Sequence, residues 1–212
     1  MRFADRADAG RRLAQVLTSI ELDDPVVLAL PRGGVPVAFE VAGALGAEMD
    51  VLVARKIGAP FQPELGVGAI AEGGVTFLDH LSLRTLGLTE EELAATIERE
   101  NAELQRRVDA YRGGRAALAL EGRTVIVVDD GLATGVTARA ALRSARSRHP
   151  KRLVLAVPVG PPDAAEIIGA DADAVVVAET PTRLSAVGQW YDDFSQTPDD
   201  EVTRLLALSR DG

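Results

Sequence analysis

The sequence has 212 residues, enough for one hydrophobic core with a small appendage. It is 47% hydrophobic and 4% aromatic, carries a net charge of −9 and contains no Cys. The missing Cys exclude disulfides, thiol catalysis and thiolate metal sites, and the acidic balance argues against a general nucleic-acid binder. The start lacks the apolar region of a signal peptide, and no charge-free apolar run approaches the roughly 18 residues of a membrane span. We therefore expect a cytoplasmic protein with neither nucleic acid nor membrane as a partner.

The first part of the chain predicts the beginning of a doubly wound α/β fold. Residues 5–20 have the 3–4 apolar spacing of an amphipathic helix, and residues 26–30 form a fully apolar run. Such a run is typical of a parallel strand buried on both faces. A second helix over residues 38–45, ended by Gly46, and a strand over residues 50–55 follow. This order is strand, turn, helix and strand, as in a mainly parallel sheet.

Two turns that follow these strands carry groups suited to anions. The first contains Arg32, Gly33 and Gly34, and it combines exposed backbone N–H groups with a guanidinium fork that matches phosphate. The second contains the adjacent cations Arg55 and Lys56. Taken alone, the first could be a plain turn and the second a solvated strand end.

The middle of the chain predicts a hairpin followed by a long helix. Short strands over residues 66–71 and 75–78 flank a Gly-Gly turn, and residues 89–111 form a charged helix that begins with a Thr89–Glu92 capping box. The apolar seam of this helix is narrow. We expect it to pack within the chain, and the alternative is a second subunit, which would make the protein a homodimer.

The most informative stretch is the segment over residues 123–137. A β-branched apolar strand over residues 124–128 leads into Asp129 and Asp130, and a loop of small and hydroxyl residues over 131–137 opens the next helix. Free N–H groups and the helix dipole make such a loop an anion site at the ligand-binding edge of an α/β sheet. Two acids beside an anion cradle suggest a phosphate next to a diol, as in a ribose 5-phosphate. There is no Lys after Gly135, so the loop is not a P-loop, and the spacing does not match a dinucleotide fold.

The last third of the chain completes the sheet and ends in an aromatic tail. Strands over residues 152–159 and 174–178, with a helix over 161–169 between them, bring the core to at least five strands. On the helix that follows the two acids, Arg139, Arg143 and Arg146 line one face, which we expect to be solvated.

Three aromatic residues, Trp190, Tyr191 and Phe194, lie within five positions of the tail. Aromatic faces stack on bases, so Trp190 is a candidate platform for a nucleobase. An equally good explanation is that these residues anchor the tail to the core.

The segment over residues 123–137 closely resembles the phosphoribosyl pyrophosphate signature of type I phosphoribosyltransferases. The overall pattern is also similar to a bacterial branch of predicted phosphoribosyltransferases with an LPRGG loop, an RKIGAP segment and a VVDDGLATG motif. The resemblance implies an α/β fold with a doubly wound, mainly parallel five-stranded sheet. It also implies that Asp129 and Asp130 hold the ribose hydroxyls. The residues implied to hold the 5-phosphate are Ala133, Thr134, Gly135, Val136 and Thr137.

The same resemblance assigns the other candidate sites. It implies that Arg32, Gly33 and Gly34 bind the pyrophosphate and that Lys56, with Arg55 as a second candidate, faces the pyrophosphate oxygens. Residues 1–212 would form a single domain, in which residues 57–115 are an insertion with a flap hairpin and the long helix. Residues 180–212 would be a C-terminal hood that carries Trp190. Glu64 and Glu72 are the acids that the flap could contribute, and either could simply face solvent.

The implied reaction transfers a phosphoribosyl group from phosphoribosyl pyrophosphate to a nitrogen acceptor that the sequence does not identify. Asp129, Asp130, Lys56 and Arg32 are the candidate catalytic residues. Mg²⁺ fits as a cofactor carried mainly by the substrate, with the two aspartates as candidate ligands. The alternative is a phosphoribosyl-binding regulator of nucleotide metabolism that has lost the chemistry. A hydrolase would need a nucleophile signature that the sequence lacks.

Overall fold

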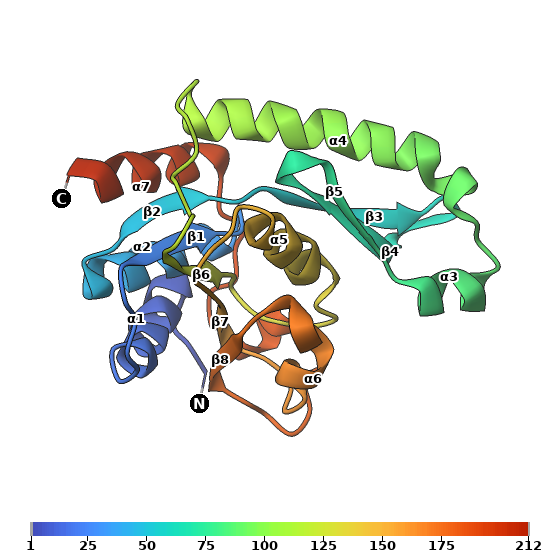
Figure 1. Ribbon diagram of the computed structural model, residues 1–212. Helices are drawn as coiled ribbons and strands as arrows, with labels where there is room; N and C mark the ends of the chain where they lie inside the picture. The colour runs from blue at the N-terminus through green and yellow to red at the C-terminus, as the bar shows by residue number, and fades with distance from the viewer. Residues whose placement is uncertain (1, 212) are drawn as a thin grey trace.

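The computed structural model describes residues 2–211, which contain a five-stranded parallel sheet and a three-stranded antiparallel sheet (Figure 1). The five-stranded sheet has the order β2-β1-β6-β7-β8, and all of its pairings are parallel. Its strands are β1 (Pro25–Ala29), β2 (Glu48–Val51), β6 (Thr124–Val128), β7 (Arg152–Val159) and β8 (Ala174–Glu179). The predicted fold class, a mainly parallel five-stranded α/β sheet, is confirmed.

Helices cover both faces of this sheet. Successive strand residues point to opposite faces, so Val27 and Ala29 pack in one apolar cluster while Val26 and Leu28 pack in another. The first cluster contains residues of α1 (Arg6–Leu17), α2 (Gly34–Leu45) and α7 (Asp199–Asp211). The second contains residues of α5 (Val136–Arg146) and α6 (Ala164–Ile168). The fully apolar strands are therefore explained by burial on both sides.

The predicted strand over residues 50–55 is wrong in one respect, because the chain changes sheets within it. β2 ends at Val51, and β3 (Ala54–Ala59) pairs with β4 (Gln62–Ala71) in the antiparallel sheet. Between them, Leu52 donates its N–H to the carbonyl of Ala29, and Val53 donates its N–H to Glu72 Oε1. An apolar run shows that a segment is buried but not which sheet it joins. Arg55 and Lys56 consequently lie on β3 and not at the end of a core strand.

The predicted hairpin and long helix are confirmed. β4 and β5 (Val75–Leu78) are antiparallel and are joined by the 3₁₀ turn Glu72–Gly74. After α3 (His80–Leu86), helix α4 (Glu90–Arg112) begins with the complete Thr89–Glu92 capping box and runs along the three-stranded sheet (Figure 1). Two further 3₁₀ turns, Gly169–Asp171 and Val187–Trp190, complete the elements. The seam of α4 packs within the chain, as expected, and its buried residues include Leu93, Leu104 and Tyr111.

Over residues 2–211, no helix is both long enough and apolar enough to cross a membrane.

Candidate functional site

The aspartate pair lies at the carboxyl end of the central strand β6. Asp129 and Asp130 follow Val128 directly, and Asp129 Oδ1 accepts a hydrogen bond of 2.8 Å from the backbone N–H of Asp130. Burial, together with the neighbouring charge of Asp130, raises the pKa of Asp129 well above its ordinary value. Burial also raises the pKa of Asp130, although the nearby guanidinium of Arg6 opposes this. The pair therefore holds like charges close together where solvent screens them poorly.

The predicted Arg32-Gly33-Gly34 turn lies directly against this pair. A Cβ atom placed on Gly33 would overlap the carboxylate of Asp130. One placed on Gly34 would lie 2.7 Å from the carbonyl oxygen of Val128 and 3.0 Å from the Cα of Asp129. The peptide bond that precedes Arg32 is cis. Only glycine allows so close an approach here, so the structure brings together two motifs that are almost one hundred residues apart.

The small-residue loop over 131–137 leads from the aspartate pair into helix α5. Ala133 and Thr134 are exposed, Gly135 has a φ of 73° as the N-cap residue, and the helix begins at Val136. The positive φ favours glycine, and the first N–H groups of a helix have no partner within the helix. With the positive end of the helix dipole, these groups favour an anion. Thr137 lies in the first turn and is partly exposed.

The guanidinium of Arg32 points to the start of α7. Arg32 Nη1 lies 3.8 Å from Asp199 Oδ1, which also accepts a 2.6 Å hydrogen bond from the hydroxyl of Tyr111. Burial and this hydrogen bond raise the pKa of Tyr111 to about 12, so the phenol stays a donor at neutral pH. The backbone of the turn thus faces the aspartates, while its charged side chain lies near Asp199 of α7.

Lys56 is placed apart from these groups. Its side chain is 44% exposed on β3, and Nζ donates to the carbonyl of Glu64 at 2.9 Å and lies 3.6 Å from Glu64 Oε2. The neighbouring Arg55 pairs with Glu100 of α4 at 2.6 Å. None of the contacts of Lys56 within residues 2–211 involves the aspartate pair, and its role at the pyrophosphate stays a prediction.

The aromatic residues of the tail pack beside the aspartates. The Tyr191 hydroxyl donates a 2.6 Å hydrogen bond to the backbone carbonyl of Asp130, and its ring lies 5.3 Å from that of Phe3. Val187 fills the space next to Gly131, where a Cβ would clash with it. These contacts anchor the tail to the core, which is the alternative to a nucleobase platform that the sequence left open. Trp190 is partly buried in the same cluster, and its role as a base platform stays a prediction.

Arg6 is a residue of this site that the sequence analysis missed. Its Nε donates to Asp130 Oδ2 at 2.9 Å, its Nη1 donates to the carbonyl of Ser195 at 2.6 Å, and its guanidinium lies 4.1 Å from the centre of the Phe194 ring. The side chain is only 11% exposed. Arg6 is separated from Asp130 by 124 positions. A signal does exist, because a cation in the first turn of a helix opposes the helix dipole and so suggests another partner.

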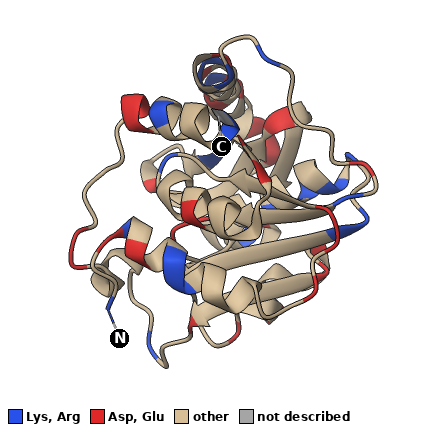
Figure 2. Cartoon of the chain, turned by 90° about the vertical axis from the view of Figure 1, so that its left-hand side faces the viewer, with Lys and Arg blue, Asp and Glu red and all other residues tan. Residues whose placement is uncertain are grey.

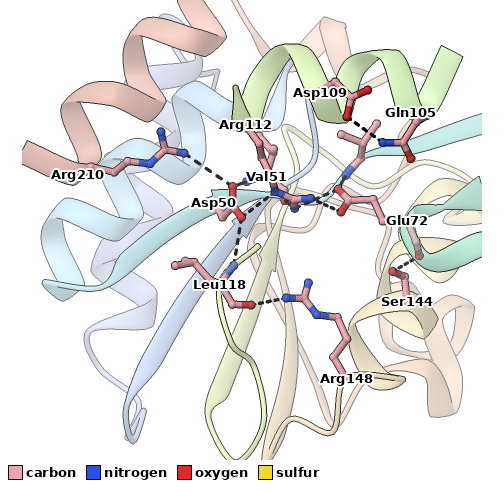
Figure 3. Close-up of polar contacts among 11 residues, drawn as sticks. Asp50, Val51, Glu72, Gln105, Asp109, Arg112, Leu118, Ser144, Arg148 and Arg210 are labelled. Atoms are coloured by element: carbon pink, nitrogen blue, oxygen red, sulfur yellow. Dashed lines mark hydrogen bonds and ion pairs between the residues drawn. The ribbon is translucent and has the colours of Figure 1, made fainter. Parts of the chain in front are cut away.

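The structure removes one of the two alternatives left open for Glu72, and it corrects the expectation that the arginines of α5 are solvated. Glu72 does not face solvent, because both of its carboxylate oxygens accept from Arg112, the closer at 2.6 Å, within a buried network (Figure 3). Arg139 and Arg143 are not simply solvated either, since both pair with Asp171 and lie over a ring of the hairpin. Arg146 pairs with an acid as well, Asp173. Packing of the 3₁₀ turn Gly169–Asp171 and of the hairpin against α5 supplies these partners, which the helical pattern of α5 alone does not reveal.

The donor set at the aspartate pair limits how a metal could bind. Within residues 2–211, no group of three or more His, Cys, Asp or Glu side chains could hold a metal ion. Mg²⁺ commonly binds through one or two carboxylates together with substrate phosphates. Two adjacent carboxylates with raised pKa values suit that mode, because a divalent cation would relieve their repulsion. Asp129 and Asp130 therefore fit Mg²⁺ that arrives with a phosphorylated ligand.

Comparisons with known proteins agree on one family. A family model described as "Phosphoribosyl transferase domain" matches residues 4–183. A curated protein of Mycobacterium tuberculosis, "Putative phosphoribosyl transferase Rv0571c", is 50% identical over 204 residues, which are 96% of this chain. The match covers 46% of that relative, so the chain spans about half the length of the curated relatives it matches.

Two solved structures resemble the chain over nearly its whole length. The protein TT1426 from Thermus thermophilus has a TM-score of 0.82 and 44% identity, with 98% of this chain and 99% of that chain covered. A hypothetical protein from Neisseria gonorrhoeae, solved with bound ppGpp, has a TM-score of 0.54 and 14% identity, with 99% of each chain covered. The second likeness shows the shared fold alone.

Proposed function

The chain belongs to the phosphoribosyl transferase domain family, and we propose that it transfers a phosphoribosyl group from phosphoribosyl pyrophosphate to a nitrogen acceptor. One observation carries this proposal. The Gly33-Gly34 backbone packs against the Asp129–Asp130 pair at the strand end from which the loop to α5 departs. Two segments whose backbone could bind an anion, the Gly33-Gly34 turn and the loop over residues 131–137, therefore adjoin the two carboxylates. A ligand with a phosphate at one end, a diol in the middle and a pyrophosphate at the other end matches that order.

Each part of the site would hold a different part of the ligand. Asp129 and Asp130 would accept hydrogen bonds from the two ribose hydroxyls. The N–H groups and Thr hydroxyls over residues 133–137 would bind the 5-phosphate. The backbone N–H of Gly33 would donate to the pyrophosphate, with Arg32 and Lys56 supplying positive charge if their side chains turn toward it. The N–H of Gly34 already donates to the carbonyl of Leu30 at 3.0 Å, so Gly34 would contribute the close approach of its backbone.

The proposed reaction breaks the bond between the anomeric carbon and the pyrophosphate oxygen and forms a carbon–nitrogen bond. Its transition state resembles an oxocarbenium ion, so the protein's task is to hold both ends of the ligand, orient the acceptor and exclude water. Bound Mg²⁺ would supply charge neutralisation at the departing pyrophosphate. No covalent nucleophile on the protein is required.

Titration calorimetry with phosphoribosyl pyrophosphate tests the binding half of this proposal. We expect binding that requires Mg²⁺ and that becomes at least about tenfold weaker in Asp130→Asn, because one hydroxyl loses a charged acceptor. Asp23→Asn is the matched control, since Asp23 is exposed and pairs with a surface lysine, Lys151. The absence of any binding to the wild-type protein would overturn the assignment of the site.

Pyrophosphate release in the presence of a nucleobase mixture tests the catalytic half. We expect turnover that Asp130→Asn reduces together with binding. The contrasting result is binding of phosphoribosyl pyrophosphate without turnover for any purine, pyrimidine or simple amine. That result would favour a regulator that retains the binding site and has lost catalytic activity.

A further inference from the structure

A large cavity lies away from the aspartate pair, on the side where the end of α7 faces α2 and β2 (Figure 1). Its volume is about 1050 Å³, near the upper end of the range for ligand pockets. One wall is α2 from its middle to its carboxyl end, including Phe39 and Gly43, and β2 contributes Met49. A Cβ on Gly43 would meet nothing within 4 Å. None of the residues assigned above to the phosphoribosyl ligand lines this cavity.

The opposite wall carries two arginines, Arg115 after α4 and Arg210 near the end of α7. Arg115 uses its Nε to donate to the carbonyl of Arg112 at 2.8 Å, and its two Nη groups have no protein partner within the described residues. Arg210 reaches no closer than 4.0 Å to Asp50, a residue that Arg112 already binds at 3.0 Å (Figure 3). Over residues 2–211, both guanidinium groups therefore keep donors that point to no protein acceptor.

Positive charge exceeds negative charge around these two residues. Arg112 is close enough for its charge to act on both Arg210 and Arg148. Asp50 and Glu72 are the acids that Arg112 bridges (Figure 3). Burial and the charge of Arg115 lower the pKa of Arg210. Burial and the charge of Arg112 likewise lower the pKa of Arg148. Such a surplus is unexpected in a protein with a net charge of −9 and attracts an anion.

The acids on the remaining walls already have partners. Glu40 lies 3.6 Å from Arg11 of α1, and Glu48 binds Arg123 at 2.6 Å. Figure 2 views this side of the molecule and shows basic segments beside the C-terminus with acidic segments around them. The free positive charge of the cavity is thus concentrated at Arg115 and Arg210.

We infer that this cavity binds a phosphorylated metabolite of nucleotide size, with its phosphate on Arg115 and Arg210 and its apolar part against Phe39 and Met49. The planar guanidinium offers paired donors that match the oxygens of a phosphate. Two guanidinium groups together offer more hydrogen-bond donors and more positive charge than a single exposed cation does. The cavity is larger than inorganic phosphate alone would fill, and phosphate has no apolar part to contact the α2 wall. This inference does not depend on the function proposed for the aspartate pair.

Titration calorimetry with adenosine 5′-monophosphate and uridine 5′-monophosphate tests the inference, with adenosine and inorganic phosphate as partial ligands. We expect at least one nucleotide to bind more tightly than either partial ligand, and its affinity to fall as salt rises. Arg115→Gln and Arg210→Gln should each weaken binding about tenfold, whereas Arg204→Gln, on the same helix but outside the cavity, should not change it.

Two further variants separate this site from the aspartate pair. Gly43→Phe places a ring in the open space without a backbone clash, so it should abolish binding while the unfolding transition stays cooperative. Asp130→Asn should leave nucleotide binding at the cavity intact. Binding that Asp130→Asn abolishes and the arginine variants spare would assign the nucleotide to the first site and overturn the inference. A wild-type protein that binds none of the probes at millimolar concentration would overturn it as well.

Discussion

The aspartate pair and the Asp50–Arg112–Glu72 triad place carboxylates in buried surroundings in opposite ways. In the triad, one guanidinium binds two carboxylates, at 3.0 Å to Asp50 and 2.6 Å to Glu72, and its Nη2 donates to the carbonyl of Val51 (Figure 3). In the pair, Asp129 and Asp130 are neighbours of like charge, and Arg6 donates its hydrogen bond to Asp130.

The difference shows which charges serve stability and which remain available for a ligand. The triad joins β2 to the turn of the β4–β5 hairpin through the last residue of α4, so it fixes the three-stranded sheet to the core. Each nitrogen of its guanidinium donates to a protein oxygen, and both carboxylates accept from that guanidinium. The pair keeps raised pKa values because burial disfavours the charged carboxylates, and the neighbouring guanidinium of Arg6 matches their charge only in part. A cation or a set of hydroxyl donors would relieve that mismatch.

The largest expected effect comes from breaking the triad with Arg112→Met. Asp50 and Glu72 would then remain buried without their cation, and removing one partner of a buried ion pair costs about 3–5 kcal/mol. We expect the free energy of unfolding in urea to fall by that amount. Arg106→Met is the matched control on the same helix, because Arg106 is 59% exposed and pairs with Glu103 at the surface. A loss of less than about 1 kcal/mol in Arg112→Met would show that the network contributes little.

A smaller effect should follow from Gly33→Ala, which tests the close approach of the turn to the aspartates. The new methyl group would displace the carboxylate of Asp130, and overpacking of this kind costs about 1–3 kcal/mol. We expect lower stability together with at least tenfold weaker binding of phosphoribosyl pyrophosphate. Gly43→Ala makes the same chemical change in open space on α2 and should stabilise the helix by about 0.5–1 kcal/mol. Equal behaviour of the two variants would contradict the steric argument.

Asp129→Asn should separate stability from function. The amide keeps the oxygen that accepts from the N–H of Asp130 and removes one of two like charges, so we expect a gain of about 0.5–2 kcal/mol at neutral pH. Binding of phosphoribosyl pyrophosphate should be lost. Urea denaturation and calorimetry on the same preparation measure both quantities, and a variant that is less stable at pH 7 would contradict the assigned repulsion.

The pH dependence of that gain has a definite sign. The unfolded chain releases the proton of Asp129 near the ordinary value of 3.8, whereas the folded chain holds it to higher pH. The folded state therefore binds more protons between these two pKa values, so the stability of the wild type falls as pH rises from about 3.8 toward the raised pKa and levels off above it. Because Asn does not titrate, the advantage of Asp129→Asn should be absent below about pH 4 and should grow toward neutral pH.

Arg6→Met should change the pair more subtly. Loss of the guanidinium removes the contact that opposes the raised pKa of Asp130, so the pH at which Mg²⁺-dependent binding is half complete should move upward. The segment at Phe194 and Ser195 should also become more accessible to protease, because Arg6 contacts both. Arg6→Lys keeps the charge and should restore much of the pH profile. A pH profile that is the same in all three proteins would show that Arg6 acts only in anchoring the tail.

Local sequence predicted most of the fold because its signals are contiguous. The apolar strands and the run from Asp129 to Thr137 each lie within one short segment, and neighbouring strand ends meet at one edge of the sheet. The contacts that distinguish the two regions are not contiguous. Arg112 is 62 positions from Asp50 and 40 from Glu72, and no periodicity links them. At the end of α4, Arg112 resembles an ordinary helix-terminal cation.

The change of sheets near Leu52 and Val53 was also beyond the sequence pattern. Both residues are buried, one in each of the two large apolar clusters, so apolar character does not separate the two strands. The apolar pattern therefore places Arg55 and Lys56 at the end of a core strand, whereas both pair with β4 in the antiparallel sheet. Burial can be read from a local pattern, whereas the choice of hydrogen-bonding partner depends on residues that arrive from elsewhere in the chain.

The smallest effect is expected from Thr89→Ala at the start of α4, which loses the capping box. Thr89 accepts from the N–H of Glu92 at 3.4 Å, and the Glu92 carboxylate accepts from the N–H of Thr89 at 2.8 Å. An N-cap substitution of this kind costs about 1 kcal/mol. Binding of phosphoribosyl pyrophosphate should be unchanged, because the triad at the far end of the helix still fixes its position. Unfolding in urea and titration calorimetry on one sample test both statements. A change in affinity beyond about twofold would show that the whole of α4, and not its anchored end alone, supports the aspartate site.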